Sequence, residues 1–301
     1  MKPQKVFNLS DATVVIPAYN EEEGIQNTLE TLKKAFPEIQ VIVVNDGSKD
    51  RTFEIASSVP GVQVLNHELN RGYGAALKTG MRRAETPVIA WYDADGQHRT
   101  EDLQKILEPI LNKQLDVAIG ARGKGSAFVA KRVPGKILLR FISQLIARRK
   151  IPDLNCGLRA FRRDVIIPYL PLLPNGFSAS ATTTLLMLKR GYHTRFIPVH
   201  ADPRVGTSTV KMSDGLRTMM ILYRILILFD SFLLFFVVAM LQVLPALAYS
   251  IYKAYQDGLG FPVLGATILT SGLITLGLGV LSQQINEIRQ ERLESSSYEH
   301  R

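Results

Sequence analysis

The sequence contains a single cysteine, Cys156, among its 301 residues. An intramolecular disulfide needs two cysteines, so none can form, and a zinc site built from several thiolates is excluded as well. The five histidines show no spacing typical of metal ligands, and His98 is interpreted as a solvated loop residue. There is also no internal repeat and no basic and aromatic stripe of the kind that binds nucleic acid. We therefore expect no nucleic-acid partner.

Charge is nearly absent from two runs near the C-terminus, residues 231–248 and 262–281. Each run has roughly the 20 residues that an α-helix needs to cross a bilayer core about 30 Å thick. The second run also contains several glycines, which lipid-embedded helices tolerate better than soluble ones. We therefore predict a transmembrane hairpin with spans at about 231–252 and 262–282. Two buried core helices of a soluble protein are the open alternative.

The segment just before the hairpin, residues 213–229, is predicted to lie along the membrane surface. Asp214, Arg217 and Arg224 share one face of a helix in this segment, as in an amphipathic helix at an interface. Asp230 follows directly, and a carboxylate at the bilayer centre would be costly. We therefore place Asp230 at the interface, where the in-plane helix gives way to the first span.

The distribution of basic residues predicts the orientation of the chain. Lysines and arginines lie on both sides of the hairpin, whereas the loop within it carries little net charge. The positive-inside rule therefore places both ends in the cytoplasm, and the absence of an apolar signal segment places the soluble part there too. The net charge of +9 suits an anionic membrane surface and phosphate-bearing substrates. We predict an inner-membrane protein with a cytoplasmic catalytic domain at 1–212, an in-plane helix at 213–229, and the hairpin with a cytoplasmic tail at 230–301.

The soluble part alternates apolar runs with amphipathic segments. Helical spacing of apolar residues is clear at Ile25, Leu29 and Leu32, and again after Leu103. The strand candidates between such segments are residues 13–17, 41–45, 62–66, 88–92 and 117–121. This alternation predicts an α/β fold with a mostly parallel sheet flanked by helices.

Polar clusters follow four of these strand candidates, at residues 17–21, 45–48, 70–72 and 93–97. Ligands of such sheets bind beyond the carboxyl ends of the strands, so the four loops are expected to converge on one crevice. Residues 72–74, Gly-Tyr-Gly, start like a dinucleotide fingerprint, but Leu77 stands where a third small residue is needed, which excludes a Rossmann site. Residues 45–50 are equally compatible with a simple Asx turn and helix cap.

The fourth cluster carries two carboxylates one residue apart, Asp93 and Asp95. Because a strand has a period of two, both side chains are expected on the same side, and Gly96 lets the chain turn. Two carboxylates with the amide of Gln97 suit a hard cation such as Mg2+ or Mn2+, which keeps positions open for substrate phosphates. The alternative is a turn with solvated carboxylates.

Five motifs in order resemble family 2 glycosyltransferases of the GT-A fold, and more narrowly their polyprenyl-phosphate, dolichol-phosphate mannose synthase-like branch. They are Val-Ile-Pro-Ala-Tyr-Asn-Glu-Glu-Glu (15–23), Val-Asn-Asp-Gly-Ser (44–48), Asn-Arg-Gly-Tyr-Gly-Ala-Ala-Leu (70–77), Asp-Ala-Asp-Gly-Gln (93–97) and Asp-Leu-Asn-Cys-Gly-Leu-Arg (153–159). The resemblance covers roughly residues 10–230. Many members have Asp-Asp-Gly-Ser where this chain has Asn45, an amide that still donates and accepts hydrogen bonds.

The resemblance implies a role for each matching residue. For the nucleotide sugar it implies contacts with Pro17, Tyr19, Glu21, Asp46, Asp93, Ala94 and Asp95, and for Mg2+ or Mn2+ it implies ligation by Asp93, Asp95 and Gln97. It implies that catalysis involves Asp153, Asp95, Arg122 and Arg132. It further implies that the acceptor phosphate is held by Arg122, Arg132, Arg204, Ser208 and Lys211.

Sugar transfer from a nucleotide diphosphate builds negative charge on the leaving group, which a divalent cation and arginines stabilise. A lipid phosphate acceptor is already largely anionic near neutral pH, since its second pKa is about 6. We therefore expect Asp153 mainly to orient the acceptor and to stabilise positive character at the sugar carbon, with a turn cap as its alternative role. The basic segment 124–132 is expected to cover the site after donor binding, and segment 205–211 is a second candidate clamp near the membrane. Solvated linkers are the alternative for both segments.

The predicted function is inverting transfer of a hexose from a nucleotide sugar to polyprenyl (undecaprenyl or dolichyl) phosphate, which yields a lipid-linked sugar donor. GDP-mannose, UDP-glucose and UDP-N-acetylglucosamine remain open as donors, and a homo-oligomer is compatible with the sequence. A processive polysaccharide synthase is disfavoured, because the only tryptophan, Trp91, lies outside any Gln-x-x-Arg-Trp motif. A catalytically silent nucleotide-sugar-binding scaffold, or an enzyme acting on another lipid or glycan, is the remaining alternative.

Overall fold

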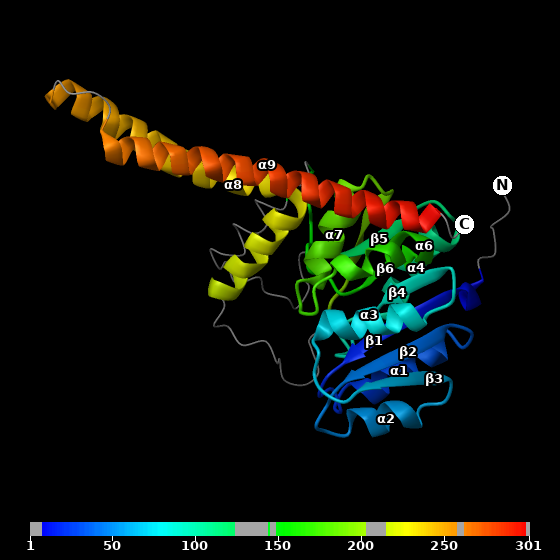
Figure 1. Ribbon diagram of the computed structural model, residues 1–301. Coiled ribbons are helices and arrows are strands. Elements are labelled where there is room, and N and C mark those ends of the chain that lie inside the picture. The colour runs from blue at the N-terminus through cyan, green and yellow to red at the C-terminus, as the bar shows by residue number, and fades with distance from the viewer. Residues whose placement is uncertain (1–7, 124–143, 145–148, 203–214, 258–261, 299–301) are drawn as a thin grey trace. The chain divides into compact units, whose positions relative to one another are not determined.

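The computed structural model describes residues 8–123, 144, 149–202, 215–257 and 262–298. The chain forms two compact units, Met1–Asp214 and Gly215–Arg301. Figure 1 labels the helices and strands of both units.

The first unit is built on a seven-stranded sheet with the order β3-β2-β1-β4-β6-β5-β7. All described pairings are parallel except those of β6, which is antiparallel to β4 and to β5. The five predicted strands are confirmed, and β6 and β7 were not predicted. The strands are β1 (Ala12–Ala18), β2 (Gln40–Asp46), β3 (Val62–His67), β4 (Val88–Trp91), β5 (Val117–Arg122), β6 (Arg159–Arg162) and β7 (Thr194–Val199).

Helices cover the sheet in the connections between the strands (Figure 1). In α1, Ile25, Leu29 and Leu32 form the buried stripe that their spacing predicts. Helix α7 has no such stripe, because all of residues 179–188 are buried, and it was therefore not recognisable as a surface helix. The helices are α1 (Ile25–Ala35), α2 (Thr52–Ser58), α3 (Tyr73–Arg83), α4 (Thr100–Leu111), α6 (Arg163–Ile166) and α7 (Ala179–Lys189), with 3-10 turns η1 (Leu9–Asp11) and η2 (Ile167–Leu172).

The centre of the sheet is the most deeply buried part of this unit. In β1, Val14, Val15 and Ile16 are each 0% exposed, as is Trp91 in β4. Strands buried on both faces carry continuous apolar runs, which is why these segments show no alternation of polar and apolar residues. Because β2, β1 and β4 are parallel neighbours, the loops after them leave the same edge of the sheet.

The second unit consists of α8 (Gly215–Asp257) and α9 (Val263–Tyr298). By length and composition, Asp230–Gln256 and Val263–Arg289 can each cross a membrane, with mean hydropathies of 2.3 and 1.9. Only 17% of each window is buried, which does not fit core helices of a soluble protein. The two helices pair through the bonds from Ser231 to Gln283 and from Thr275 to Gln242, each 3.2 Å long. These are the two apolar helices predicted to form a hairpin.

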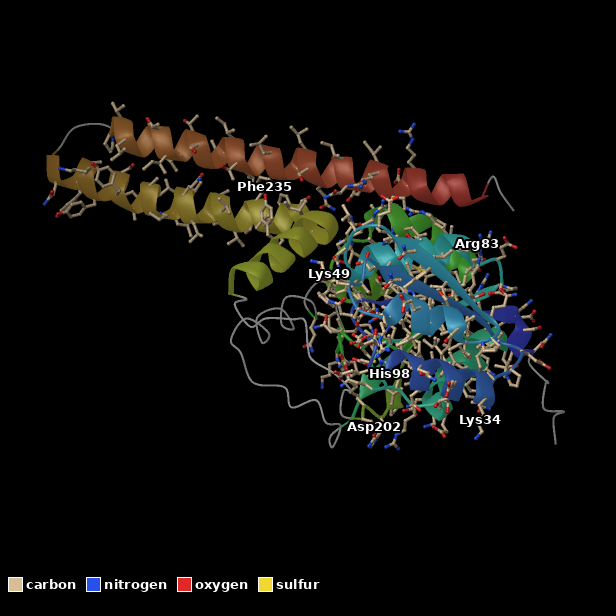
Figure 2. The ribbon with its side chains drawn as sticks, turned by 90° about the horizontal axis from the view of Figure 1, so that it is seen from below. Lys34, Lys49, Arg83, His98, Asp202 and Phe235 are labelled. Atoms are coloured by element: carbon tan, nitrogen blue, oxygen red, sulfur yellow. The ribbon has the colours of Figure 1, made fainter. Side chains whose placement is uncertain are left out.

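Close packing between α8 and α9 depends on small residues. A Cβ on Gly272 would lie 2.5 Å from Cγ2 of Val243, and one on Gly279 would lie 2.6 Å from Cβ of Phe235, which is labelled in Figure 2. The predicted glycine-rich second run therefore has a packing role as well, because glycine lets the two backbones approach.

Helix α8 is interrupted at Asp230, where φ is −158° and ψ is 65°. The carboxylate of Asp230 accepts a hydrogen bond from the backbone N–H of Leu233 at 3.2 Å. An aspartate with non-helical backbone whose side chain accepts the N–H of the third residue of the next helix acts as an N-cap. Asp230 therefore starts a new helical segment at the beginning of the first candidate span.

Replacing Gly80 by valine tests the packing of α3 on the sheet. A Cβ on Gly80 would lie 2.3 Å from Cγ1 of Val15, so valine must displace the centre of β1. We expect the free energy of unfolding to fall by about 1–3 kcal/mol, a loss typical of overpacked cores. Thermal unfolding of the full chain in detergent measures it. Gly176→Val is the control, because a Cβ there meets no atom within 4 Å, and an equal loss in both variants would contradict the packing argument.

Candidate active site

The acidic motif was predicted to continue the alternation of the strand before it, but the structure shows that it does not. Strand β4 ends at Trp91, although the N–H of Tyr92 still bonds the carbonyl of Val15 at 3.1 Å. Residues 94–95 form a turn, and Gly96 has φ +70°. The expectation that strand alternation orients Asp93 and Asp95 alike is therefore wrong, because the turn sets their directions instead.

Asp93 is held by two side chains from different parts of the chain. Its Oδ1 accepts a hydrogen bond from the hydroxyl of Tyr73 at 3.0 Å, and its Oδ2 lies 3.2 Å from Nε2 of His98. Burial raises the pKa of Asp93, but the bonds from His98 and Tyr73 and the charge of Arg122 outweigh it and hold the pKa below its usual value. Asp93 is therefore a charged carboxylate at neutral pH.

His98 is not the solvated loop residue that the sequence suggested. Its side chain is 3% exposed and pairs with Asp93. The ring of Tyr92 meets the imidazole edge-on with centroids 5.6 Å apart, and the hydroxyl of Tyr92 donates to the backbone carbonyl of His98. The prediction failed because the burial of this loop depends on the tertiary packing of β4 and α4.

Asp95 and Gln97 form the other half of the motif. Asp95 is 6% exposed, and its Oδ1 accepts the N–H of Gln97 at 3.2 Å. Gln97 and Asp202 share two hydrogen bonds, one to each backbone carbonyl, at 3.2 and 2.9 Å. Ala94 is buried, and its carbonyl accepts the hydroxyl of Thr28 at 3.2 Å. This loop is thus anchored to α1 on one side and to the segment after β7 on the other.

The donor set of this loop suits a hard divalent cation. In the described part of the chain, no group of three or more His, Cys, Asp or Glu side chains is arranged to hold a metal. Mg2+ characteristically binds through one or two protein carboxylates together with substrate phosphates. Asp93 and Asp95, with the side-chain amide oxygen of Gln97, fit that requirement. A site completed by a diphosphate does not need a third acidic ligand.

Asp153 and Arg122, both predicted from the family resemblance, form an ion pair. Arg122 Nε lies 2.6 Å from Oδ2 of Asp153, and its Nη2 lies 3.0 Å from Oδ1. Burial raises the pKa of Asp153, but the hydrogen bonds and charge of Arg122 lower it more. The N–H of Asn155 also bonds Oδ1 at 3.0 Å, as an Asx turn does, so the turn-cap role holds alongside the ion pair.

Gly157 brings the two acidic motifs into contact. A Cβ at this position would lie 1.9 Å from Oδ2 of Asp93, so the carboxylate packs directly against the backbone of Gly157. Gly157 belongs to the same turn-rich segment as Asp153. The metal-binding candidate and the Asp153–Arg122 pair therefore lie on adjoining segments.

Arg159 is a buried cation that is not among the predicted site residues. It is 0% exposed and donates to the carbonyls of Cys156 and Ser180 and to the hydroxyl of Thr184. Its guanidinium carbon lies 5.1 Å from the ring centroid of Trp91, and burial lowers its pKa. An arginine between Leu158 and Ala160 in an apolar strand was the signal that could have identified it.

Asp46, the predicted nucleotide contact, is buried among hydrogen-bond donors at the end of β2. It is 2% exposed, and its carboxylate accepts the N–H groups of Arg71 and Gly72 at 2.9 and 2.7 Å. His67 Nδ1 lies 2.7 Å from the same carboxylate, and its Nε2 lies 2.9 Å from the hydroxyl of Thr79. In this arrangement, Asp46 holds the loop before α3 in place.

The remaining predicted donor residues lie along the end of β1. Pro17 is buried within the strand, whereas Tyr19 and Glu21 are half-buried in the loop that follows. The N–H of Asn20 bonds the hydroxyl of Ser48 at 3.0 Å, so this loop lies beside the one that follows β2. Arg132, Arg204, Ser208 and Lys211, with segments 124–132 and 205–211, lie outside the described residues.

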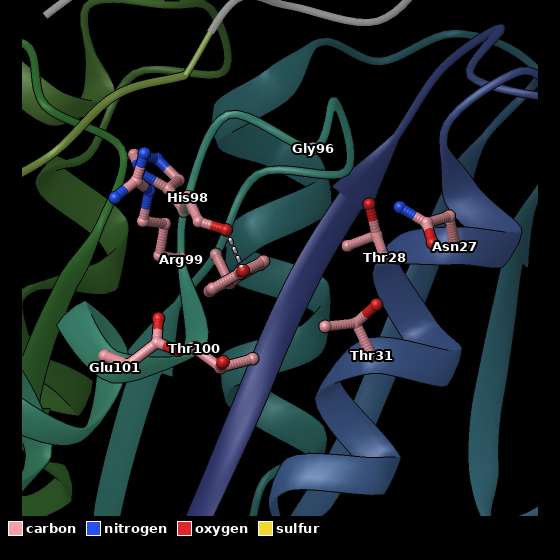
Figure 3. A pocket seen from close by; sticks show the side chains of 9 residues that line it. Asn27, Thr28, Thr31, Gly96, His98, Arg99, Thr100 and Glu101 are labelled. Carbon is pink, nitrogen blue, oxygen red and sulfur yellow. Dashed lines mark hydrogen bonds between the residues drawn. The ribbon is translucent and has the colours of Figure 1, made fainter.

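A pocket of about 450 Å³ lies next to the acidic loop. Figure 3 shows side chains of α1 on one side and the start of α4 on the other, and the dashed line marks the bond between Tyr92 and His98. Arg99, the residue after His98, forms an ion pair with Asp202 at 2.6 Å. The pocket is lined by Asn27, Thr28, Thr31, Tyr92, Gly96, His98, Arg99, Thr100 and Glu101.

Known proteins are similar to this chain in sequence, and solved structures are similar to it in fold. An uncharacterised protein of Methanocaldococcus jannaschii is 36% identical over 202 residues, which cover 64% of this chain and 82% of the relative. The UDP-N-acetylglucosamine–dolichyl-phosphate N-acetylglucosaminyltransferase of Methanococcus voltae is 32% identical and covers 51% and 70%. Further relatives are named dolichyl-phosphate or undecaprenyl-phosphate sugar transferases.

A solved structure supports the fold at lower identity. Glucosyl-3-phosphoglycerate synthase from Mycobacterium tuberculosis, in complex with Mn2+, UDP and phosphoglyceric acid, aligns with a TM-score of 0.57 and 18% identity. The alignment covers 71% of this chain and 77% of that one. Residues 13–170 match the model of the family described as Glycosyl transferase family 2, which is more than half of the chain. The chain therefore belongs to glycosyl transferase family 2.

Proposed function

We propose that this enzyme transfers a hexose from a nucleotide diphosphate sugar to a polyprenyl phosphate, with inversion at the sugar carbon. The observation that carries the proposal is the contact between Asp93 and Gly157. Through this contact, the carboxylate that is the candidate metal ligand lies next to the segment that carries the Asp153–Arg122 ion pair. The names of the relatives, with dolichyl or undecaprenyl phosphate as acceptor, support the same substrate class.

On the donor side, Tyr19 and Glu21 would line the nucleotide pocket, with Pro17 and Ala94 shaping its base. Asp93, Asp95 and the side-chain amide oxygen of Gln97 would hold Mg2+ or Mn2+, because oxygen ligands suit either ion. When bound, the ion supplies Lewis-acid stabilisation of the leaving diphosphate. Asp46 would act indirectly, since both of its oxygens hold the loop before α3.

On the acceptor side, the ion pair provides a positive charge on Arg122 for the acceptor phosphate and a negative charge on Asp153 for the sugar carbon. Arg122 would attract a lipid phosphate, and the family resemblance adds Arg132, Arg204, Ser208 and Lys211 to that binding set. An incoming phosphate competes with Asp153 for the guanidinium of Arg122. Asp153, whose low pKa keeps it charged, then orients the acceptor and stabilises positive charge at the sugar carbon.

The proposal includes an arrangement of the chain at the membrane. The N-cap at Asp230 supports a break between an in-plane helix at 213–229 and the first span, because a new helix starts there. A surface helix would keep residues 1–212 close to lipid headgroups, where a polyprenyl phosphate presents its phosphate. We place the catalytic unit on the cytoplasmic face of the inner membrane, as the flanking basic residues predict.

Transfer can be measured directly with the full chain in detergent. We expect one extractable glycolipid when the enzyme, a short polyprenyl phosphate and Mn2+ or Mg2+ are mixed with the correct labelled donor. The panel contains GDP-mannose, UDP-glucose and UDP-N-acetylglucosamine, and chelation with EDTA should abolish the product. Activity towards a water-soluble acceptor alone, or product formation in EDTA, would contradict the proposed acceptor or the proposed metal.

Replacing Asp153 by asparagine separates its role from donor binding. Turnover should fall by about 100-fold or more, because the amide cannot stabilise positive charge, while donor affinity changes little. Steady-state kinetics and nucleotide titration measure the two effects.

Asp116→Asn is the matched control for this variant, since Asp116 forms an ion pair with Arg162 at 3.0 Å just before the start of β5. Its turnover should stay close to that of the parent chain. A large loss of donor affinity in Asp153→Asn would instead place Asp153 in the nucleotide site.

A further inference from the structure

We infer that Tyr73 and His98 are positioning residues that fix the carboxylate of Asp93 for metal binding. This inference rests on the proposed function, because it assumes that Asp93 ligates the divalent cation. Neither residue belongs to the predicted metal-binding or nucleotide-binding set.

The two residues approach the carboxylate from separate elements. Tyr73 is the first residue of α3, and its hydroxyl reaches Oδ1 at 3.0 Å. His98 lies in the loop before α4, and its Nε2 reaches Oδ2 at 3.2 Å. Each carboxylate oxygen has two lone-pair sites, so each bond leaves a site on the same oxygen for a cation.

The backbone of Gly157 closes a third side of this carboxylate. A Cβ at Gly157 would lie 2.5 Å from Cγ and 1.9 Å from Oδ2 of Asp93. Rotation of the side chain towards Gly157 is therefore blocked by van der Waals contact. Two directional hydrogen bonds and one steric wall define a single orientation of the carboxylate.

Tyr73 is itself held in place as a donor. Its ring stacks on Phe177 with centroids 5.5 Å apart and an angle of 19° between the planes. A hydroxyl beside an ionised carboxylate can only donate to it.

Only one of the two ring nitrogens of His98 has a hydrogen-bond partner among the described residues. Its Nε2 contacts Asp93, whereas its buried Nδ1 has no hydrogen-bond partner among the described residues. The ring is fixed instead by edge-on contact with Tyr92 and by the bond from Tyr92 to the backbone of His98. The hydrogen bond that the described structure assigns to this imidazole is therefore the one to the proposed metal ligand.

Hydrogen bonds to a ligating carboxylate orient it and strengthen metal binding, and their removal typically weakens affinity by about 10–100-fold. Loss of either donor here would let the carboxylate of Asp93 sample further orientations. Metal affinity is therefore the quantity that should respond to substitution, before any step of sugar transfer.

The test measures binding of Mn2+ alone by electron paramagnetic resonance, with the full chain in detergent. We expect Tyr73→Phe and His98→Asn each to weaken Mn2+ binding by about 10-fold or more. His98→Gln should stay within a few-fold of the parent chain, because its amide nitrogen lies at about the reach of Nε2. The asparagine nitrogen corresponds to Nδ1 and cannot reach Asp93. Tyr169→Phe is the control for hydroxyl removal, since that buried tyrosine bonds Tyr192 at 3.1 Å instead.

The outcomes separate the two levels of the proposal. If the parent chain binds no Mn2+, or if Asp93→Asn binds it equally well, the proposed metal site fails and the positioning role fails with it. If Asp93→Asn loses binding while Tyr73→Phe and His98→Asn bind like the parent, only the positioning role is overturned. If His98→Gln loses as much affinity as His98→Asn, the hydrogen bond of His98 is not the cause. Melting temperatures of all variants identify any loss that comes from unfolding.

Discussion

The packing of the Asp93 carboxylate against the backbone of Gly157 is the contact on which the arrangement of the site depends. It joins the loop after β4 to the segment that precedes β6, although 64 residues separate the two in sequence. Any side chain at position 157 would occupy the space of the carboxylate. Glycine is therefore required here for close approach, independently of its backbone dihedral angles.

Charge balance around this contact explains why the site tolerates so many buried ionic groups. Asp153 is neutralised by Arg122, and Asp93 receives hydrogen bonds from Tyr73 and His98. Arg159 is fully buried without a described carboxylate contact, and backbone carbonyls and the ring of Trp91 offset its desolvation. A buried cation at this depth favours negative charge on the neighbouring groups. The site is thus prepared for anionic ligands with a compensating metal ion.

The second unit differs from the first because its helices expose most of their apolar side chains. Its helices pair through glycines and a few polar side chains, as lipid-embedded helices do, because apolar burial provides no driving force within lipid. Asn286 donates to the carbonyl of Ile227, close to the interruption at Asp230. Two backbone groups near this interruption, the carbonyl of Ile227 and the N–H of Leu233, are therefore satisfied by side chains of the unit itself.

The sequence by itself determined the α/β alternation, the five strands of the predicted sheet, the two apolar helices and the family. These features depend on local periodicity, on runs without charge and on contiguous motifs, all of which are readable along the chain. Only the tertiary structure decided that Asp46 binds the loop before α3, that His98 is buried against Asp93, and that Arg159 is fully buried. Each of these depends on which side chains meet across β2, β4 and β6, and sheet order and register are not encoded in any one segment.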